Sequence, residues 1–270
     1  MGAMGETSMS WPEMFATSRV DPMTYVIFRG LSASLLVGHQ LAHWWSFREE
    51  GWLYLIYMTH WTMILGTISE VLLFHLARKA MAQVPTRHEM PTLARLELIL
   101  WHVVQPFSLI VMILFWTSWL LENPVDDLQQ MNYMDFYAHG LGHVWLLLSF
   151  LMCNVPFSFW TGFGSCVTYA LVYVAWSLIH FFAKIGTAQP CDVYPQNECP
   201  IYSKLDWHKP QLPIVIASLV CLVACPVVCA FYATLAARCR RGQDEDNETK
   251  TKHPRASKSK VEIAVDMAAP

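Results

Sequence analysis

The stretch LILWHVVQPFSLIVMILFWTSWLL, residues 98–121, contains no Asp, Glu, Lys or Arg and decides the fold class. As a helix it is about 36 Å long, enough to cross a hydrocarbon core of about 30 Å. It lies within 88 consecutive residues, between Arg95 and Lys184, that include no Lys or Arg. Because lipid offers no hydrogen-bond partner to an exposed backbone, such a stretch is predicted to be a membrane-spanning helix.

The composition of the whole chain agrees with this interpretation. Of its 270 residues, 54% are hydrophobic and 14% are charged, whereas soluble domains have about 25% charged residues. This excludes a soluble cytosolic enzyme and a fully disordered chain. The net charge of −3 argues against bulk nucleic-acid binding, which needs a basic surface. The sequence therefore predicts a multi-pass membrane protein, with membrane lipid as a partner and no nucleic acid.

Six stretches are long and apolar enough to be predicted as spans, and we expect an all-α integral membrane bundle of six transmembrane helices. The predicted spans are 25–46, 52–76, 98–121, 134–155, 164–185 and 213–236. They form a membrane domain over residues 25–236. A cytosolic N-terminal segment, 1–24, precedes it, and a disordered cytosolic tail, 237–270, follows it.

The basic residues predict the orientation of these spans. Segments on the side of the two termini carry 13 Lys or Arg, eight of them in the tail, whereas the opposite side carries three or four. Because cytoplasmic loops are enriched in Lys and Arg, both termini are predicted to be cytosolic. Loops 47–51, 122–133 and 186–212 then face the lumen or exterior, in the plasma membrane or the endoplasmic reticulum.

Two cysteines in the largest outer loop predict a disulfide. Cys191 and Cys199 enclose the short polar segment CDVYPQNEC. On the predicted orientation this loop lies in an oxidising compartment, where such pairs are oxidised. Cys239, between Arg238 and Arg240, is a weaker candidate for palmitoylation.

Histidines are the most unusual feature of the spans, because intramembrane ionisable residues are costly and often functional. Eight of the eleven histidines fall inside predicted spans: His39, His43, His60, His75, His102, His139, His143 and His180. Counting from the span ends puts Thr59 about 10 Å deep, and His139 and His143 about 8 and 14 Å deep. Six of the eight histidines thus share the outer leaflet with Thr59.

A single intramembrane His is most often a packing group that hydrogen-bonds to a neighbouring helix. As a set, however, the outer cluster of polar residues fits three chemistries. A Thr hydroxyl beside a His can act as a nucleophile with its general base. Histidine pairs at i, i+4 can bind a transition metal, and histidines on facing helices can hold haem. Glu70 is expected either to pair with His102 in a structural contact between helices or to belong to a functional site.

Three segments in order resemble a known family. WLYLIYMTHW, Trp52 to Trp61, is similar to the "W-x-x-Y-x-T-x-W" segment of the rolling stone family of multi-pass membrane proteins. His139-Gly-Leu-Gly-His143 resembles the "HG" segment of that family and of the related androgen-induced membrane proteins. IYSKLDWHKP, Ile201 to Pro210, is similar to the "iYpxLdWxxP" segment that precedes the last span of rolling stone proteins.

The resemblance implies a function. The androgen-induced proteins are intramembrane hydrolases with a Thr nucleophile and a catalytic His, and they cleave fatty acid esters of hydroxy fatty acids. By motif position the nucleophile would be Thr59. Their His segment reads H-G-x-H with the second His catalytic, whereas this chain reads H-G-x-G-H. An ungapped alignment of the two segments puts Gly142 at the position of the catalytic His, and an alignment shifted by one residue puts His143 there.

We therefore predict an intramembrane hydrolase of lipid acyl esters with Thr59 as nucleophile, His143 as general base and His139 as the second choice. No cofactor is predicted for this reaction. Two alternatives stay open. One is a non-catalytic membrane protein of cell fusion or development, which is the role that rolling stone proteins suggest. The other is a membrane protein whose histidines ligate a metal or haem.

Overall fold

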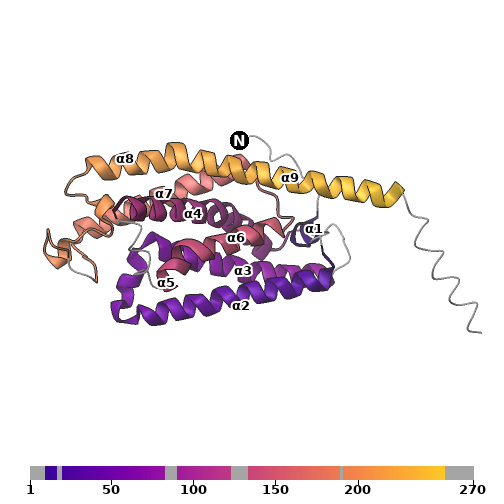
Figure 1. The fold of residues 1–270 in the computed structure, drawn as a ribbon, viewed down its shortest axis with the longest axis horizontal. Coiled ribbons are helices and arrows are strands. Elements are labelled where there is room, and N and C mark those ends of the chain that lie inside the picture. The colour runs from indigo at the N-terminus through magenta and orange to yellow at the C-terminus, as the bar shows by residue number, and fades with distance from the viewer. Residues whose placement is uncertain (1–9, 17–19, 83–89, 123–132, 189–190, 253–270) are drawn as a thin grey trace, which may run out of the picture.

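The chain folds as a bundle of helices. The structure is a computed structural model that describes residues 10–16, 20–82, 90–122, 133–188 and 191–252, and these residues contain helices, turns and loops but no strand. The α-helices are α1 (Trp11–Phe15), α2 (Pro22–Ser46), α3 (Met58–Ala82), α4 (Thr92–Glu122), α5 (Tyr133–Phe136), α6 (Gly142–Leu151), α7 (Phe159–Phe182), α8 (Gln211–Leu219) and α9 (Cys225–Lys252). Figure 1 shows α2, α3, α4, α6 and α7 running alongside one another, with α8 and α9 along one edge.

Shorter segments connect these helices. They are the 3-10 segments η1 (Arg48–Ile56), η4 (Gln196–Glu198) and η5 (Ser203–Leu205), and the π-helical segments η3 (Tyr137–Leu141) and η6 (Val220–Ala224). Segment η3 joins α5 to α6, and η6 joins α8 to α9. Gly51 has φ +58° inside η1, a backbone conformation that L side chains rarely adopt. This turn lets the chain reverse between α2 and α3.

Helical stretches occupy all six ranges that the sequence predicts as spans. Three of them are long and apolar enough to cross a membrane: Thr92–Leu120, Phe159–Phe182 and Gln211–Cys239. The all-helical fold class is therefore confirmed. Three helices of spanning length and composition support a membrane protein, and the count of six spans stays a prediction. Helices α2 and α3 carry more polar residues, and the fourth stretch is divided into α5, η3 and α6.

The core is built from aromatic and aliphatic side chains of α3, α4, α6, α7 and α9. Trp101 and Phe150 stack with ring centroids 5.1 Å apart, and Phe150 meets Tyr232 of α9 edge-on at 4.8 Å. Phe107 packs edge-to-face on Tyr169 at 4.5 Å. Such pairs add to the stabilisation from apolar burial. They hold α4 at the centre of the bundle, where it contacts both α7 and α9.

A charged pair is buried in the same bundle. Arg29 of α2 and Glu70 of α3 are fully buried, with a guanidinium nitrogen 3.3 Å from a carboxylate oxygen. Ser32 donates to Glu70 at 2.8 Å, and Ser149 bonds to both charged side chains. His102, the expected partner of Glu70, instead accepts the backbone N–H of Ser158 at 3.0 Å. Buried charges need this degree of pairing and hydrogen bonding.

Helices occur near both ends of the described chain. In the N-terminal segment, Trp11, Met14 and Phe15 of α1 are buried in the core, and α1 packs on α3. At the other end α9 continues to Lys252, so the first part of the tail expected to be disordered is helical. Extending an existing helix costs far less than starting one, and α9 extends from the last apolar stretch. Residues 253–270 lie outside the described part.

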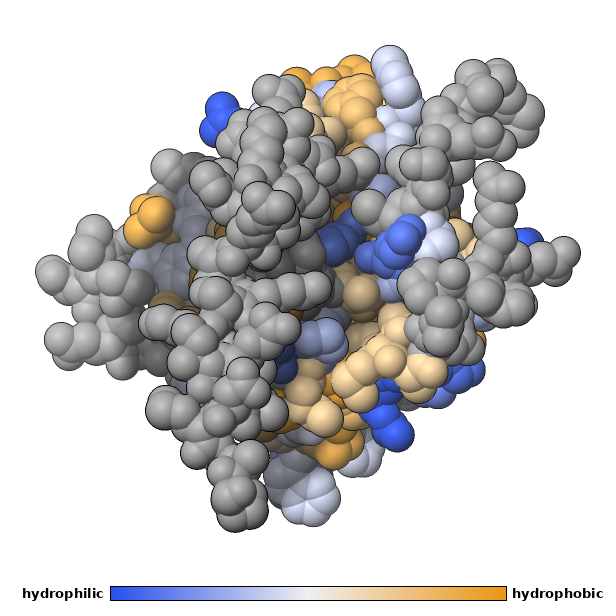
Figure 2. Space-filling model, turned by 90° about the vertical axis from the view of Figure 1, so that its right-hand side faces the viewer, coloured by the Kyte–Doolittle hydropathy of each residue, from blue (hydrophilic) through white to orange (hydrophobic). Residues whose placement is uncertain are grey.

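The two ends of the bundle differ. The loop between α7 and α8 and the start of α3 lie at one end, and α1 lies at the other (Figure 1). Figure 2 views the end at which α1 lies, where hydrophilic residues show among hydrophobic ones. On the predicted orientation, the loop between α7 and α8 belongs to the outer side.

Candidate functional site

Thr59 lies in the first turn of α3, at the end of the bundle that carries the large loop. It is 6% exposed and is the second residue of a helix that begins at Met58. The predicted span had begun at residue 52, but residues 52–56 belong to the 3-10 segment η1. The count of about 10 Å of depth assumed one continuous helix from residue 52, whereas Thr59 sits at the start of α3, at the bundle end that carries the loop between α7 and α8.

The hydroxyl of Thr59 meets the imidazole of His139, with 3.3 Å between Oγ1 and Nε2. The other ring nitrogen of His139, Nδ1, is 3.0 Å from the carbonyl oxygen of Asp135. Because a carbonyl oxygen only accepts, Nδ1 carries the proton and Nε2 is left with its lone pair. The Thr59 hydroxyl therefore donates to Nε2, which is the arrangement of a nucleophile and its general base.

Several contacts fix the orientation of His139. Its ring stacks on Phe115 of α4 with centroids 3.6 Å apart, and Trp116 donates its indole N–H to the His139 carbonyl oxygen at 2.6 Å. His139 also lies within η3, the π-helical segment Tyr137–Leu141. π-Helical turns inside α-helices are frequent at functional sites. Here the segment directs His139 toward the start of α3.

Two tyrosines complete the surroundings of Thr59. Tyr202, from the loop before α8, accepts the backbone N–H of Met58 at 3.1 Å, and its hydroxyl interacts with Thr59. Tyr173 of α7 donates to the carbonyl oxygen of Ile56 at 2.8 Å. Burial raises the pKa of Tyr202, so its hydroxyl keeps its proton at neutral pH.

His143, the base expected from the sequence, does not contact Thr59. It is 5% exposed, and neither ring nitrogen makes a hydrogen bond. It lines a small pocket between α2, α3 and the η3–α6 stretch. His139, the second choice, takes the place next to Thr59. His143 lies one turn farther along the helix and does not reach the Thr59 hydroxyl.

The other histidines of the expected outer cluster bond mostly to the protein itself. His39 contacts the Tyr133 hydroxyl at 2.6 Å, His43 contacts the Tyr54 hydroxyl at 2.9 Å, and His180 contacts the Gly186 carbonyl oxygen at 2.6 Å. Among the described residues, no group of three His, Cys, Asp or Glu side chains converges as a metal site needs. These three histidines are hydrogen-bonding groups within the bundle.

Sequence reasoning missed two contributors to this end of the bundle. One is Tyr202: the segment Ile201 to Pro210 carries the family resemblance, but the resemblance implies no role for the Tyr202 hydroxyl. The other is the carbonyl of Asp135, which sets the tautomer of His139. A signal for the second was present, because residues four apart on a helix are neighbours. No sequence signal pointed from Tyr202 to Thr59.

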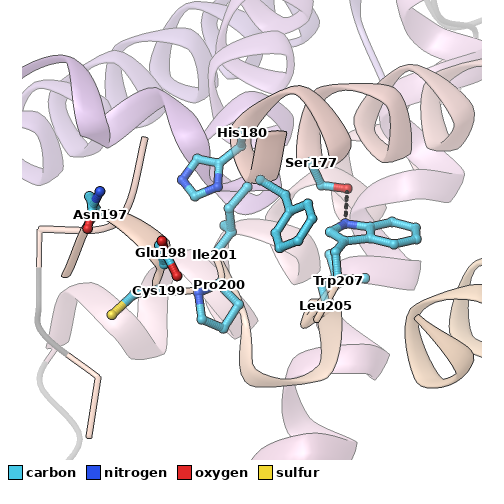
Figure 3. A pocket seen from close by; sticks show the side chains of 10 residues that line it. Ser177, His180, Asn197, Glu198, Cys199, Pro200, Ile201, Leu205 and Trp207 are labelled. Carbon is cyan, nitrogen blue, oxygen red and sulfur yellow. Dashed lines mark hydrogen bonds between the residues drawn. The ribbon is translucent and has the colours of Figure 1, made fainter. Parts of the chain in front are cut away.

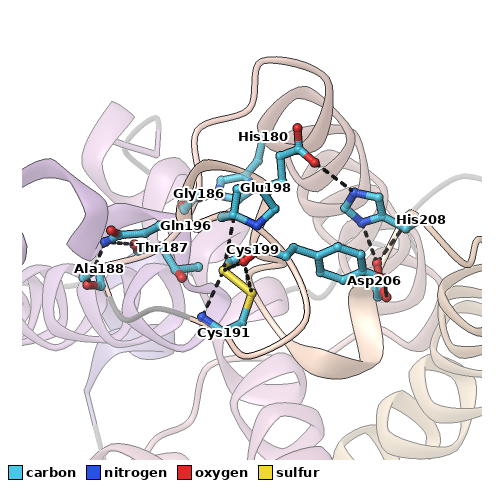
Figure 4. The surroundings of a disulfide bond; sticks show 12 residues. His180, Gly186, Thr187, Ala188, Cys191, Gln196, Glu198, Cys199, Asp206 and His208 are labelled. Atoms are coloured by element: carbon cyan, nitrogen blue, oxygen red, sulfur yellow. Dashed lines mark hydrogen bonds and ion pairs between the residues drawn. A yellow bond between two sulfur atoms is a disulfide. The ribbon is translucent and has the colours of Figure 1, made fainter.

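The loop between α7 and α8 contains the Cys191–Cys199 disulfide, with Cα atoms 5.8 Å apart (Figure 4). Gly186 has φ +72°, and an added Cβ would lie 2.2 Å from the Gln196 carbonyl oxygen. Only glycine fits at such a position. Because the two sides of the loop approach closely at this point, the loop folds back over the end of the bundle near Tyr202.

Polar side chains hold the same loop together. Lys184, at its start, pairs with Glu198 at 2.7 Å. Asp206 accepts a hydrogen bond from the Tyr194 hydroxyl at 2.9 Å and one from the ring of His208, also at 2.9 Å, and Figure 4 shows the latter. The hydrogen bond from Lys184 lowers the pKa of Glu198. Burial raises the pKa of Asp206, but the hydrogen bonds from His208 and Tyr194 outweigh burial and lower it.

A second pocket lies between α7 and this loop. Figure 3 shows Ser177 and His180 of α7 facing Pro200, Ile201 and Trp207 of the loop. The Trp207 indole N–H donates to the Ser177 hydroxyl at 3.1 Å. None of the three predicted catalytic residues lines this pocket, so we assign it to the docking of the loop.

Comparison with known proteins adds no assignment to this geometry: no family model, no curated protein and no solved structure matches the chain.

Proposed function

We propose that the chain is a six-span membrane protein that hydrolyses acyl esters of membrane lipids, with Thr59 as nucleophile and His139 as general base. The observation that carries the proposal is the 3.3 Å contact between the Thr59 hydroxyl and His139 Nε2. It is strengthened by the Asp135 carbonyl, which leaves Nε2 free to accept a proton. With both termini cytosolic, the pair lies at the outer end of the bundle. There the ester groups of lipids in the outer leaflet are within reach.

The chemistry follows from the arrangement. His139 Nε2 takes the Thr59 proton while Oγ1 attacks the ester carbonyl carbon, and the carbonyl electrons move onto oxygen. The tetrahedral intermediate collapses, the alcohol leaves with the proton from His139, and an acyl–Thr59 ester remains. Water then attacks this ester, again with His139 as base, and releases the fatty acid and free Thr59.

The developing oxyanion needs a hydrogen-bond donor, and we assign this role to Tyr202. Its oxygen accepts from Met58 N–H, and its hydroxyl lies beside Thr59, so its proton is within reach of an oxyanion formed there. The hydroxyl is also held at the start of α3, where the helix dipole favours negative charge. Tyr202→Phe keeps the ring and removes only this donor, and we expect it to lower kcat more than it changes KM.

The resemblance to rolling stone and androgen-induced proteins supports the same proposal. Thr59 falls at the nucleophile position of their aromatic segment. The His segment of this chain has one residue more than the H-G-x-H pattern, and η3 covers most of it. A π-helical turn holds more residues than an α-helical turn, so the extra residue is accommodated without breaking the helix. His139, the first His of the segment, then faces Thr59.

The test is labelling and turnover by full-length protein in lipid vesicles. We expect a fluorophosphonate probe to label the wild type on Thr59, and Thr59→Ala to abolish both labelling and lipid-ester cleavage. His139→Ala should do nearly the same, since a nucleophile and its base act as a unit. Thr168→Ala, which removes an exposed Thr on α7 bonded to its own helix, is the matched control.

Wild-type turnover by Thr59→Ala would remove the proposal, as would the absence of any lipid-ester cleavage by well-folded wild-type protein. In either case the non-catalytic membrane protein becomes the better interpretation. His143→Ala separates the two histidines. If His143 were the base, its loss would abolish labelling, whereas the structure predicts that labelling survives because His143 does not touch Thr59.

A further inference from the structure

A small pocket lies one helical turn inward from the Thr59–His139 pair. Its walls include Leu36 and Gln40 of α2, Met63 and Gly66 of α3, and His143 and Leu146 of α6. Met63 follows Thr59 by four residues, so the pocket begins about 6 Å farther along α3. A molecule bound at Thr59 can therefore extend into this pocket.

Two polar groups in the pocket have no hydrogen-bond partner in the described part of the protein. They are the imidazole of His143 and the side-chain carbonyl of Gln40. The Ala138 carbonyl lies near His143 but not in hydrogen-bonding geometry. The amide nitrogen of Gln40 donates to the Tyr54 hydroxyl at 2.9 Å, and its amide oxygen is buried without a partner.

Unpaired polar groups are costly in a membrane protein, because no water is present in the hydrocarbon to satisfy them. Two of them in one pocket indicate a ligand that hydrogen-bonds there. Gln40 offers an acceptor, and the His143 ring offers one donor and one acceptor. A hydroxyl group is complementary to both, because it donates one hydrogen bond and accepts others.

The pocket also discriminates by charge. Its lining contains no Lys, Arg, Asp or Glu. A carboxylate or phosphate bound there would lose its hydration without gaining a cation, which is costly. The other lining residues are uncharged. Leu36, Met63, Gly66 and Leu146 are apolar or small, and the hydroxyls of Thr62 and Thr67 bond to carbonyl oxygens of their own helix. A neutral hydroxyl on an aliphatic chain therefore fits better than a charged headgroup.

We propose that His143 and Gln40 bind a free hydroxyl on the ester substrate, held about one helical turn from the scissile carbonyl. The proposal rests on the proposed function for its catalytic half and names the substrate class: lipid esters that also carry a neutral hydroxyl. That hydroxyl can come from a hydroxylated acyl chain or from the glycerol of a partial glyceride. Both sources present the same group to the same two side chains.

The first experiment compares substrates in phosphatidylcholine vesicles. Three esters are used: the methyl ester of an acyl chain whose hydroxyl lies about one helical turn's length from the carbonyl, a monoacylglycerol, and the methyl ester of the unsubstituted chain. At least one hydroxyl ester should show a kcat/KM about 100-fold above that of the unsubstituted ester, since a site built to bond a hydroxyl rejects analogues that lack it. The ester that responds identifies the source. Equal rates on all three would overturn the proposal.

Variants test the two side chains. His143→Phe and Gln40→Leu each remove a hydrogen-bonding group at similar size, and each should lower the preference for the hydroxyl ester by about tenfold or more. His75→Phe changes an exposed His on α3 outside the pocket and is the matched control. A preference that survives both pocket variants would overturn the assignment.

A binding measurement separates this proposal from the proposed function. The Thr59→Ala variant is photolabelled with a diazirine-bearing long-chain alcohol and with the diazirine-bearing alkane of the same length. Labelling of pocket peptides by the alcohol, lost in His143→Phe, supports the hydroxyl site even if no ester is cleaved. Equal labelling by alcohol and alkane would mean that only water satisfies the two groups, and would overturn the site.

Discussion

Removing the charge of Glu70 tests how the bundle tolerates charge. Glu70 and Arg29 are fully buried, and the Arg29 guanidinium bonds to Glu70, to the Tyr25 hydroxyl at 3.0 Å and to the Ser149 carbonyl oxygen at 3.0 Å. Glu70→Gln keeps the shape but leaves the guanidinium without its counter-charge. Breaking a buried pair in this way costs about 3–5 kcal/mol of unfolding free energy.

The opposite change should cost less. In Arg29→Met the carboxyl group of Glu70 can take up a proton and become neutral, whereas a guanidinium stays charged in proteins. The protonated carboxyl can still accept from Ser32. We therefore expect Arg29→Met to cost about 1–3 kcal/mol, the range for losing a partner of buried polar groups. The double variant should lose less unfolding free energy than the two single variants lose together, by about 2 kcal/mol.

The assay is unfolding of detergent-solubilised protein by SDS, followed by tryptophan fluorescence. Glu97→Gln is the control, because Glu97 is also fully buried but the amide keeps an oxygen for the 2.6 Å bond from Ser69. We expect it to change the unfolding free energy by less than about 1 kcal/mol. The assigned pairing would be refuted if the losses of unfolding free energy in the two single variants added up to the loss in the double variant. It would also be refuted if Glu70→Gln lost no more unfolding free energy than Glu97→Gln.

Three further predictions concern the outer loop and the topology. Peptide mapping without reduction should show Cys191 linked to Cys199, and Cys191→Ser should destabilise the closed loop by about 2–3 kcal/mol, seen as faster hydrogen exchange; two freely alkylated thiols would contradict it. Because Glu198 and Asp206 have lowered pKa values, their contribution to loop stability is present at neutral pH and is lost as pH falls through about 4 and below; loop exchange that is insensitive to acid would count against these contacts. In intact cells, protease should digest tags at both termini only after the membrane is permeabilised, if both termini are cytosolic; digestion of either tag without permeabilisation would reverse the orientation.

Hydropathy predicted where the helices lie because it measures the quantity that places them, the transfer of apolar surface out of water. It failed at the start of α3. Residues 52–56 are as apolar as a span, yet they form η1 because Gly51, at φ +58°, turns the chain between α2 and α3. Transfer energy carries no information on backbone dihedral angles. Arg29 was missed for a related reason: near the end of a predicted span, a charge is ordinarily assigned to the interface.

The choice between His139 and His143 shows the same limit at the candidate site. An α-helical period of 3.6 residues puts both on one face, and no reading of the sequence with that period can separate them. The two residues differ in the neighbours that other helices bring to them. His139 lies 3.3 Å from the Thr59 hydroxyl, whereas His143, one turn farther along, lines the pocket with Gln40. Periodicity along one helix carries no information on these neighbours. In our proposals they give the two histidines different roles: the first moves a proton, and the second recognises a neutral group on the same molecule.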